Sequence, residues 1–339
     1  MKNQIFNIYL KIILSHMHRC GLEADALLER SGLGQFSQQL IDINQTCDFD
    51  AFLDLLHLAE AASQDPLFCA RAGSFIHPGD YGKVGQLLMN CDSYGHSIVM
   101  SYRFQHLVNN VLQRRPYTLN NTIYSRIHDL HYDTDRIRPY IEMEHAALVY
   151  MSHFITGHMY TNVPITLCFR HAARASKDDY QAIFKTPLKF DCDHNEIVIP
   201  TLVMIAPIHS PDKTVFNLLY RELRNIEKEL SIEPEIESQV RLFLEAISYE
   251  KGPKLQLCAQ LLDTSTSTLK RRLAQLGTSF QAIQDEIRYN QSCELLEDKK
   301  FSIADIAYSL GFSSSAAFIR SFKKWSGETP GDFAKHHIK

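Results

Sequence analysis

The chain contains 339 residues, of which 45% are hydrophobic and 22% charged, and its formal net charge at pH 7 is −4. A chain of this length and hydrophobic content can bury two cores, so we expect two domains. Its eight cysteines lie singly, and residues 1–20 show no long apolar run or small-residue cleavage site. We therefore expect no disulfide framework and no membrane span, and a soluble protein of the reducing cytoplasm.

Residues 1–231 combine two kinds of hydrophobic spacing. Helical spacing predicts helices over residues 5–20, 49–62, 81–90, 97–112, 143–158 and 211–230. The alternation of apolar and polar residues predicts strands within residues 118–130, and a run of apolar residues predicts a buried strand at residues 164–169. Phe190 and residues 197–199 flank the turn Asp193-His194-Asn195, which indicates a hairpin. The N-terminal region is therefore expected to be an α+β domain.

Histidines and arginines in this region raise the question of a ligand site. Of the sixteen histidines, His16 shares a helix face with Cys20, but this pair and the others lack a third ligand nearby. A structural zinc site needs four ligands with recognisable spacing, so no metal, haem or other cofactor is expected. Arg103, Arg126 and Arg170 are suited to an anionic effector, but snorkelling or internal ion pairs explain them better. No effector-binding residue is assigned.

The second domain is placed at residues 232–339, beginning with a predicted helix over residues 235–249. A first helix–turn–helix pattern follows, whose opening helix has an apolar face of Leu255, Leu257, Cys258, Leu261 and Leu262. Ser265 is placed to cap the next helix through its hydroxyl, and Gly277 ends that helix. Its core stripe is Leu269, Leu273 and Leu276, and its opposite side presents Ser267, Lys270, Arg271 and Ala274.

A second copy of the pattern opens at Ser302, which forms a capping-box-like pair with Asp305. The buried stripe of its opening helix is Ile303, Ile306, Ala307 and Leu310. Gly311 can take the positive φ of a sharp turn, and Phe312 can fill the space between the helices. The serine run at residues 313–315 starts the next helix, whose core stripe is Phe318, Phe322 and Trp325. Its outward face holds Ala316, Arg320 and Lys323, flanked by Ile319 and Lys324.

A single helix over residues 279–297 is predicted to join the two patterns and to hold them at a fixed separation. Successive major-groove faces of DNA lie roughly 34 Å apart, so such a connector suits recognition of two adjacent groove segments. From Lys254 onward, twelve lysines and arginines stand against nine aspartates and glutamates, whereas the preceding residues carry twenty-three against thirty. This asymmetry is typical of a DNA-reading tail on an acidic body, and the alternative is a solvated basic helix face.

The last hundred residues resemble the DNA-binding domain of the AraC/XylS family of transcriptional regulators. The matching residues are Leu269-Lys270-Arg271-Arg272-Leu273, Gly277-Thr278-Ser279-Phe280, Arg288, Ile303-Ala304-Asp305-Ile306-Ala307, Leu310-Gly311-Phe312-Ser313, Phe318, Phe322-Lys323-Lys324-Trp325, Gly327 and Pro330. The chain departs from the family at Thr266-Ser267, where Pro-Arg is frequent, and at Ser314-Ser315, where Asp-Pro is frequent. Serine hydrogen-bonds to several bases, so weaker specificity is expected where the arginine is missing.

A second resemblance lies in the N-terminal region, at Pro78-Gly79-Asp80-Tyr81-Gly82 and in the stretch of residues 184–207. Both are similar to the effector-sensing domain of one AraC-type subgroup, which is named arabinose-binding. The resemblance implies that residues 1–231 sense a small metabolite such as an amino acid, organic acid or fatty acid. It also implies promoter DNA and RNA polymerase as partners, activation rather than repression, and either a monomer or a homodimer.

Three classes of function remain. The leading one is a sequence-specific, effector-responsive activator that sets two recognition helices into successive segments of the major groove. Its expected DNA contacts are Thr266, Ser267, Lys270, Arg271, Ser314, Ser315, Ala316, Ile319, Arg320, Lys323 and Lys324. The alternative is a regulator with weakened DNA affinity that acts through protein contacts. An enzyme is not expected, because the sequence lacks a GxSxG elbow, a P-loop, a GxGxxG and an HExxH motif.

Overall fold

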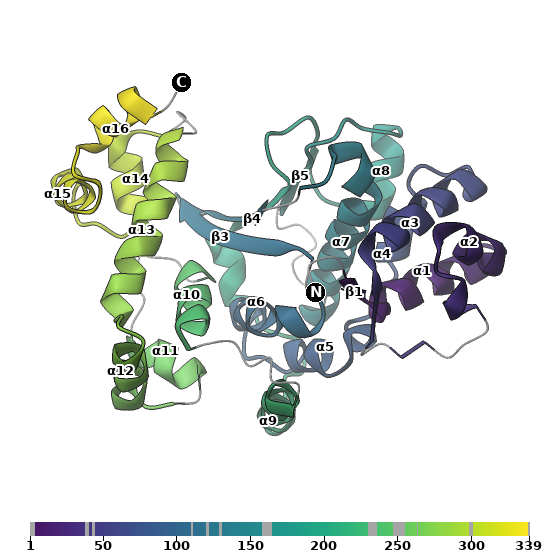
Figure 1. Ribbon diagram of the computed structural model, residues 1–339, viewed down its shortest axis with the longest axis horizontal. Helices are drawn as coiled ribbons and strands as arrows, with labels where there is room; N and C mark the ends of the chain where they lie inside the picture. Colours follow the sequence, from purple (N-terminus) through teal and green to yellow (C-terminus); the bar gives the residue numbers. More distant parts are fainter. Residues whose placement is uncertain are drawn as a thin grey trace. The chain divides into compact units, whose positions relative to one another are not determined.

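The computed structural model describes residues 4–37, 41–42, 45–109, 111–119, 122–128, 131–157, 165–229, 236–246, 255–262, 264–297 and 301–337. The chain divides into two compact units. Unit 1 contains residues 1–114, 126–199 and 203–226, and unit 2 contains residues 115–125, 200–202 and 227–339. Unit 1 mixes helices with strands and unit 2 is built around helices, which confirms the expected fold class (Figure 1).

The first part of unit 1 is mainly helical. Strands β1 (Gln4–Phe6) and β2 (Thr46–Asp48) pair antiparallel, and each leads directly into a helix. These are α1 (Asn7–Arg19) and α3 (Phe49–Ser63). In the chain, α2 (Ala24–Ser31) follows α1 and α4 (Phe68–Gly73) follows α3. Both α1 and α3 bury one apolar face, as their helical spacing predicts.

Helix α7 (Thr134–Ile155) is the central element of unit 1 and begins nine residues before the predicted start. Asp133 caps it by accepting hydrogen bonds from the backbone N–H groups of residues 135 and 136. Helix α4 packs tightly on it at Gly73, where an added Cβ would lie 2.2 Å from the backbone oxygen of Met143. The missed first turns of α7 are largely buried yet include Arg138, so periodicity in apolar residues alone does not mark them.

Buried charges on α7 are held by hydrogen bonds. Arg138 donates to the Glu142 carboxylate at 2.9 Å and also pairs with Glu60. The Tyr180 hydroxyl donates to Glu142 at 2.7 Å, and burial raises the pKa of Glu142 to about 7. Glu144 instead accepts from the Tyr9 hydroxyl and from Asn109. The two carboxylates therefore belong to separate networks, as their spacing of two along the helix predicts.

The larger of the two sheets has the strand order β3-β4-β7-β5-β6. Its strands are β3 (Gln113–Leu119), β4 (Thr122–His128), β5 (Thr166–Cys168), β6 (Leu188–Lys189) and β7 (Glu196–Pro200). The predicted hairpin around Asp193-His194-Asn195 is wrong, because β5 lies between the two strands. β5 pairs parallel with β6 and antiparallel with β7, so β6 and β7 do not pair with each other.

The remaining helices of unit 1 are α5 (Gly82–Leu88), α6 (Tyr94–Arg103), α8 (Lys177–Phe184) and α9 (Lys213–Glu229). The helix expected over residues 97–112 is wrong beyond Arg103. A short 3-10 turn follows at Gln105–Leu107, and β3 then begins at Gln113. Within the described part of the chain, no helix combines the length and apolar character needed to cross a membrane.

Unit 2 is organised around the long helix α13 (Phe280–Glu297) (Figure 1). Near the start of α13 lie α10 (Ile236–Ala246), α11 (Leu255–Leu261) and α12 (Thr266–Gln275). Near its end lie α14 (Ile303–Ser309), α15 (Ser315–Ser326) and α16 (Pro330–His337). Residue 235 and residues 247–249 of the predicted helix at 235–249 lie outside the described residues. One hydrophobic cluster joins Ile283 and Ile287 to α10, α11 and α12. A second cluster joins Leu295 and Leu296 to α14, α15 and α16.

The tip of the β3–β4 hairpin also belongs to unit 2, which the sequence did not reveal. Tyr117 is 6% exposed in the second cluster, together with Leu295 and Leu296. Its ring stacks on that of Tyr124 with centroids 5.0 Å apart and an angle of 7° between the rings. The tip therefore contributes an aromatic pair to the core that supports α14 and α15.

Candidate nucleic-acid interface

Helix α12 is fixed by a cap at its start and by two leucines on one face. The Ser265 hydroxyl accepts the backbone N–H of Thr268 at 3.1 Å, which confirms the predicted cap. Leu269 and Leu273 are fully buried in the first cluster. With these anchors inward, the 100° step of the helix turns Ser267, Lys270, Arg271 and Ala274 outward, and all four are exposed.

Helix α15 is fixed in the same way. The Ser314 hydroxyl accepts the backbone N–H of Ala317 at 3.2 Å, and Gly327 ends the helix in the left-handed region with φ 88°. Phe318 and Phe322 are fully buried in the second cluster, and Trp325 packs against it. The outward side presents Ala316, Ile319, Arg320, Lys323 and Lys324, which are all exposed.

The turn between α14 and α15 is held by aromatic contacts. Gly311 has φ 75°, as the sharp turn requires, and the Phe312 ring lies 5.5 Å from that of Phe318 and 6.0 Å from that of Trp325. On its other side the Arg288 guanidinium lies 5.0 Å from the Phe312 ring centre. Ser302 and Asp305 form the predicted capping box at the start of α14, and the hydrogen bonds from Ser302 lower the pKa of Asp305. Pro330 is buried where α16 begins.

The outward sides of α12 and α15 are strongly positive. Together the two helices carry six exposed cations, and within the described residues none of the six forms a salt bridge or a side-chain hydrogen bond: Lys270, Arg271, Arg272, Arg320, Lys323 and Lys324. Lys323 does help to lower the pKa of Asp332, although the Thr329 hydroxyl is the main cause. In contrast, Arg241 on α10 is paired with Glu237 at 3.2 Å and Glu286 at 2.9 Å. The two helices thus keep their charge available to an anionic partner.

Three predicted contact residues are only half-buried and lie at helix starts. They are Thr266, Ser314 and Ser315. The Ser314 hydroxyl already serves as a cap, which the sequence analysis did not assign to it. The cap uses one acceptor site, so the hydroxyl proton is still available to a phosphate or base.

Two predicted core residues are exposed instead. Leu257 on α11 is 42% exposed, and Leu276, which follows the last residue of α12, is 47% exposed. Helix α12 ends at Gln275, so the predicted i+7 position falls on the cap residue and no longer follows the helical stripe. The side chain of Leu261 is not described.

Other residues considered from the sequence have structural roles. Arg126 pairs with Glu196 at 3.2 Å, and the buried Arg103 lies 4.6 Å from the Phe104 ring centre. His16 contacts Cys20 at 3.8 Å between Nε2 and Sγ. Across the described ranges there is no group of three or more histidine, cysteine or acidic side chains placed to hold a metal ion.

Comparison with known proteins adds two family models. One, described as the arabinose-binding domain of AraC transcription regulator, matches residues 21–208, and one described as a helix-turn-helix domain matches residues 258–336. The ornithine utilization regulator of Pseudomonas aeruginosa is 25% identical over 188 residues, which are 56% of this chain and 55% of that protein. This chain therefore aligns with only about half the length of that relative.

Two further regulators are similar over different lengths. The HTH-type transcriptional regulator VqsM of Pseudomonas aeruginosa is 23% identical over 269 residues, or 77% of this chain and 81% of that protein. The virulence regulon transcriptional activator VirF of Shigella flexneri is 32% identical over 101 residues, or 30% of this chain and 38% of that protein. Since the arabinose-binding model alone matches more than half of the sequence, the chain belongs to the AraC family of transcription regulators.

Proposed function

We propose that this protein reads promoter DNA by setting α12 and α15 into successive segments of the major groove. The observation that carries the proposal is the set of six cations on these two helices, which are exposed and form no salt bridge within the described residues. Cations that are already paired contribute little to phosphate binding, whereas unpaired ones release counterions when they contact DNA.

The length of α13 supports the use of both helices at once. Its 18 residues span about 27 Å at 1.5 Å per residue. Successive major-groove faces lie roughly 34 Å apart, and α12 and α15 pack on opposite halves of α13. The separation of the two helices along α13 is therefore close to the spacing of the two groove segments.

Roles for the individual residues follow from their places on the helices. We assign Ser267, Lys270 and Arg271 on α12 and Ala316, Ile319 and Arg320 on α15 to the groove, since they lie in the middle of the outward sides. Thr266, Ser314 and Ser315 at the helix starts, with Lys323 and Lys324 near the end of α15, are assigned to the edges of the contact and the phosphates.

We further propose that residues 1–231 form an effector-sensing domain and residues 232–339 the DNA-reading domain. The match of residues 21–208 to an arabinose-binding family model supports a ligand-dependent switch. A ligand can change promoter occupancy only if it binds the two DNA-binding states with different affinity. We also propose that the protein activates transcription through RNA polymerase, and the similarity to VirF, a transcriptional activator, supports activation rather than repression.

The test is a DNA-binding titration with the full-length protein. A randomised duplex library first yields a selected site, and a scrambled duplex serves as the non-specific target. Lys324→Ala should weaken binding to both duplexes equally and reduce the salt slope by about 1, because one phosphate contact is lost. Arg320→Ala should cost about 1–3 kcal/mol on the selected site and relax the base preference there.

Lys335→Ala is the charge-matched control, because Lys335 is an exposed cation of unit 2 on α16. If Arg320→Ala and Lys324→Ala both bind as the wild type does, the assignment of α15 to DNA is refuted. If the wild type enriches no duplex even at low salt, the regulator instead acts through protein contacts, as the serines at residues 267 and 314 would then suggest.

A further inference from the structure

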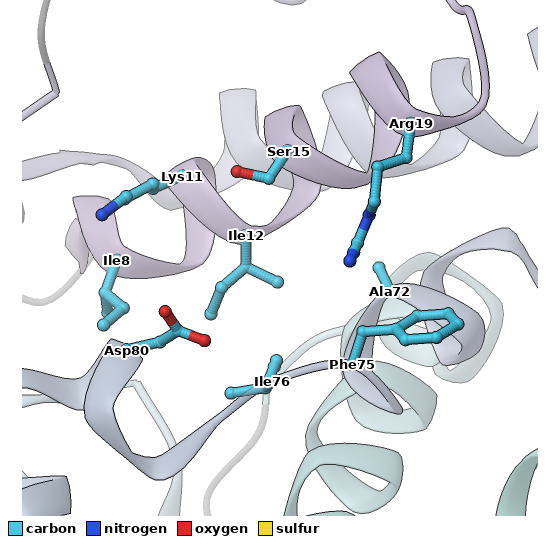
Figure 2. Close-up of a pocket in the computed structure, with 9 residues that line it drawn as sticks. All are labelled: Ile8, Lys11, Ile12, Ser15, Arg19, Ala72, Phe75, Ile76 and Asp80. Atoms are coloured by element: carbon cyan, nitrogen blue, oxygen red, sulfur yellow. The ribbon is translucent and has the colours of Figure 1, made fainter.

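Unit 1 contains a pocket of about 180 Å³ that no residue of the proposed DNA interface touches. Helix α1 forms one wall, and the segment from Ala72 to Asp80 forms the other (Figure 2). Its floor is apolar, since Ile8, Ile12 and Ile76 are at most 8% exposed. The lining combines these apolar side chains with polar ones, and small-molecule sites pair apolar walls with polar groups that fix the orientation of the ligand.

The wall opposite α1 is held in a fixed conformation. The 3-10 helix η2 (Pro78–Tyr81) starts with a capping box in which the Asp80 carboxylate accepts the backbone N–H of His77 at 2.8 Å. The His77 ring in turn accepts the backbone N–H of Gly79 at 2.9 Å. Just beyond, Gly85 packs so closely on the Pro78 carbonyl that an added Cβ would lie 1.7 Å from its oxygen. The pocket is therefore preorganised rather than free to collapse.

Two opposite charges point into this pocket from its two ends. Figure 2 shows the Arg19 guanidinium directed from α1 toward Phe75 and Ala72, whereas the Asp80 carboxylate lies near Ile8 and Ile12. Arg19 lies 4.8 Å from the Phe75 ring centre and has no carboxylate partner among the described residues. Asp80 uses one carboxylate oxygen for the His77 N–H, and a carboxylate has several further acceptor positions.

Two further polar residues, Lys11 and Ser15, line the pocket from α1. Lys11 extends along α1 away from Arg19 and is exposed. His16 packs behind Phe75 with ring centres 5.9 Å apart, and burial lowers its pKa, which keeps the ring neutral at pH 7. Phe75 itself is 57% exposed, an unusual exposure for a phenylalanine that is held on both sides by ring and cation contacts.

We propose that this pocket binds a linear amino acid whose ammonium and carboxylate groups are separated by an aliphatic chain. The carboxylate pairs with Arg19 beside Phe75, the chain lies over Ile12 and Ile76, and the ammonium pairs with Asp80. Arginine holds a carboxylate through two parallel hydrogen bonds, so it fixes the orientation of the ligand as well as attracting it. We identify this pocket as the effector site of the proposed regulator. The regulatory role rests on the proposed function, whereas the binding of the ligand does not.

The proposal is tested with ε-aminocaproate as the probe, using calorimetric titration of the full-length protein. Caproate lacks the ammonium and hexylamine lacks the carboxylate, so both should bind at least ten-fold more weakly than the zwitterion. Arg19→Gln should weaken ε-aminocaproate roughly ten- to hundred-fold while leaving hexylamine unchanged. Asp80→Asn keeps an acceptor for the cap and should make ε-aminocaproate and caproate bind equally.

Arg30→Gln is the matched control, because Arg30 is an exposed arginine on α2 that does not line the pocket. The selective loss expected in each variant separates an altered site from a misfolded protein, which would lose all three probes together. Absence of binding by γ-aminobutyrate and ε-aminocaproate alike, or binding that Arg19→Gln and Asp80→Asn leave unchanged, would overturn the proposal. A probe that binds through both residues but leaves the affinity for the selected DNA site unchanged supports this site and refutes its effector role.

Discussion

The contribution of the β3–β4 tip to unit 2 leads to a prediction about stability. Tyr117→Ala removes a ring that is 6% exposed in the second cluster and stacked on Tyr124 at 5.0 Å. Truncation of a buried aromatic side chain costs about 3–5 kcal/mol through lost burial and the cavity that remains. With a urea slope of about 1–3 kcal/mol/M for a small unit, the midpoint of unfolding should fall by roughly 1–5 M.

The chain provides its own probe for this measurement. Trp325 is the single tryptophan of the protein and packs against the same cluster, so selectively excited tryptophan fluorescence reports on this core. Tyr308→Ala is the matched control, since Tyr308 lies on α14 and is 60% exposed. A Trp325 transition that is the same in Tyr117→Ala, Tyr308→Ala and the wild type would show that the tip does not support the core of unit 2.

Two further changes have defined outcomes. Ser314→Ala removes the N-cap of α15 and should lower the stability reported by Trp325 by about 1 kcal/mol, whereas Ser314→Asn should retain it, and equal urea midpoints for both variants would contradict the capping role. Burial lowers the pKa of His171 from 6.5 to about 4, so the unfolded chain takes up a proton that the folded one does not. This contribution to the free energy of unfolding is complete above pH 6.5 and is lost as the pH falls toward 4. The unfolding free energy of His171→Gln, measured by circular dichroism in urea, should therefore depend less steeply on pH in this range than that of the wild type. If the unfolding free energies of the variant and the wild type fall in parallel with pH, His171 is not the group responsible.

Local chemistry in unit 2 could be predicted from the sequence. The capping side chains, Ser265, Ser302 and Asp305, bond to groups at most three residues away. The local sequence alone therefore predicts their roles. The outward positions of Lys270 and Arg320 follow from the buried stripe on the same helix. Predictions failed where a stripe was extended past a helix end, as at Leu276, because the helical angle no longer applies there.

Pairings between distant residues could not be predicted in this way. Alternating residues indicate strands, but nothing near residues 190–199 shows that Thr166–Cys168 inserts between the two strands. The place of Tyr117 in unit 2 depends on residues about 180 positions later in the chain. A signal did exist, since an aromatic pair at the tip of a hairpin needs a covering surface, but periodicity within residues 118–130 does not identify that surface.

Helices α12 and α15, which we propose to read DNA, owe their positions to separate cores on one long helix. Leu269 and Leu273 anchor α12 on the first half of α13, and Phe318 and Phe322 anchor α15 on the second half. A single turn of α13 contacts the elements around both reading helices. Glu286 forms a salt bridge with Arg241 of α10, and the Arg288 guanidinium lies over the Phe312 ring, which precedes α15. Damage to either core should therefore displace one reading helix and leave the other in place. Binding at half of the selected site should then survive, which separates this arrangement from a single cooperative core.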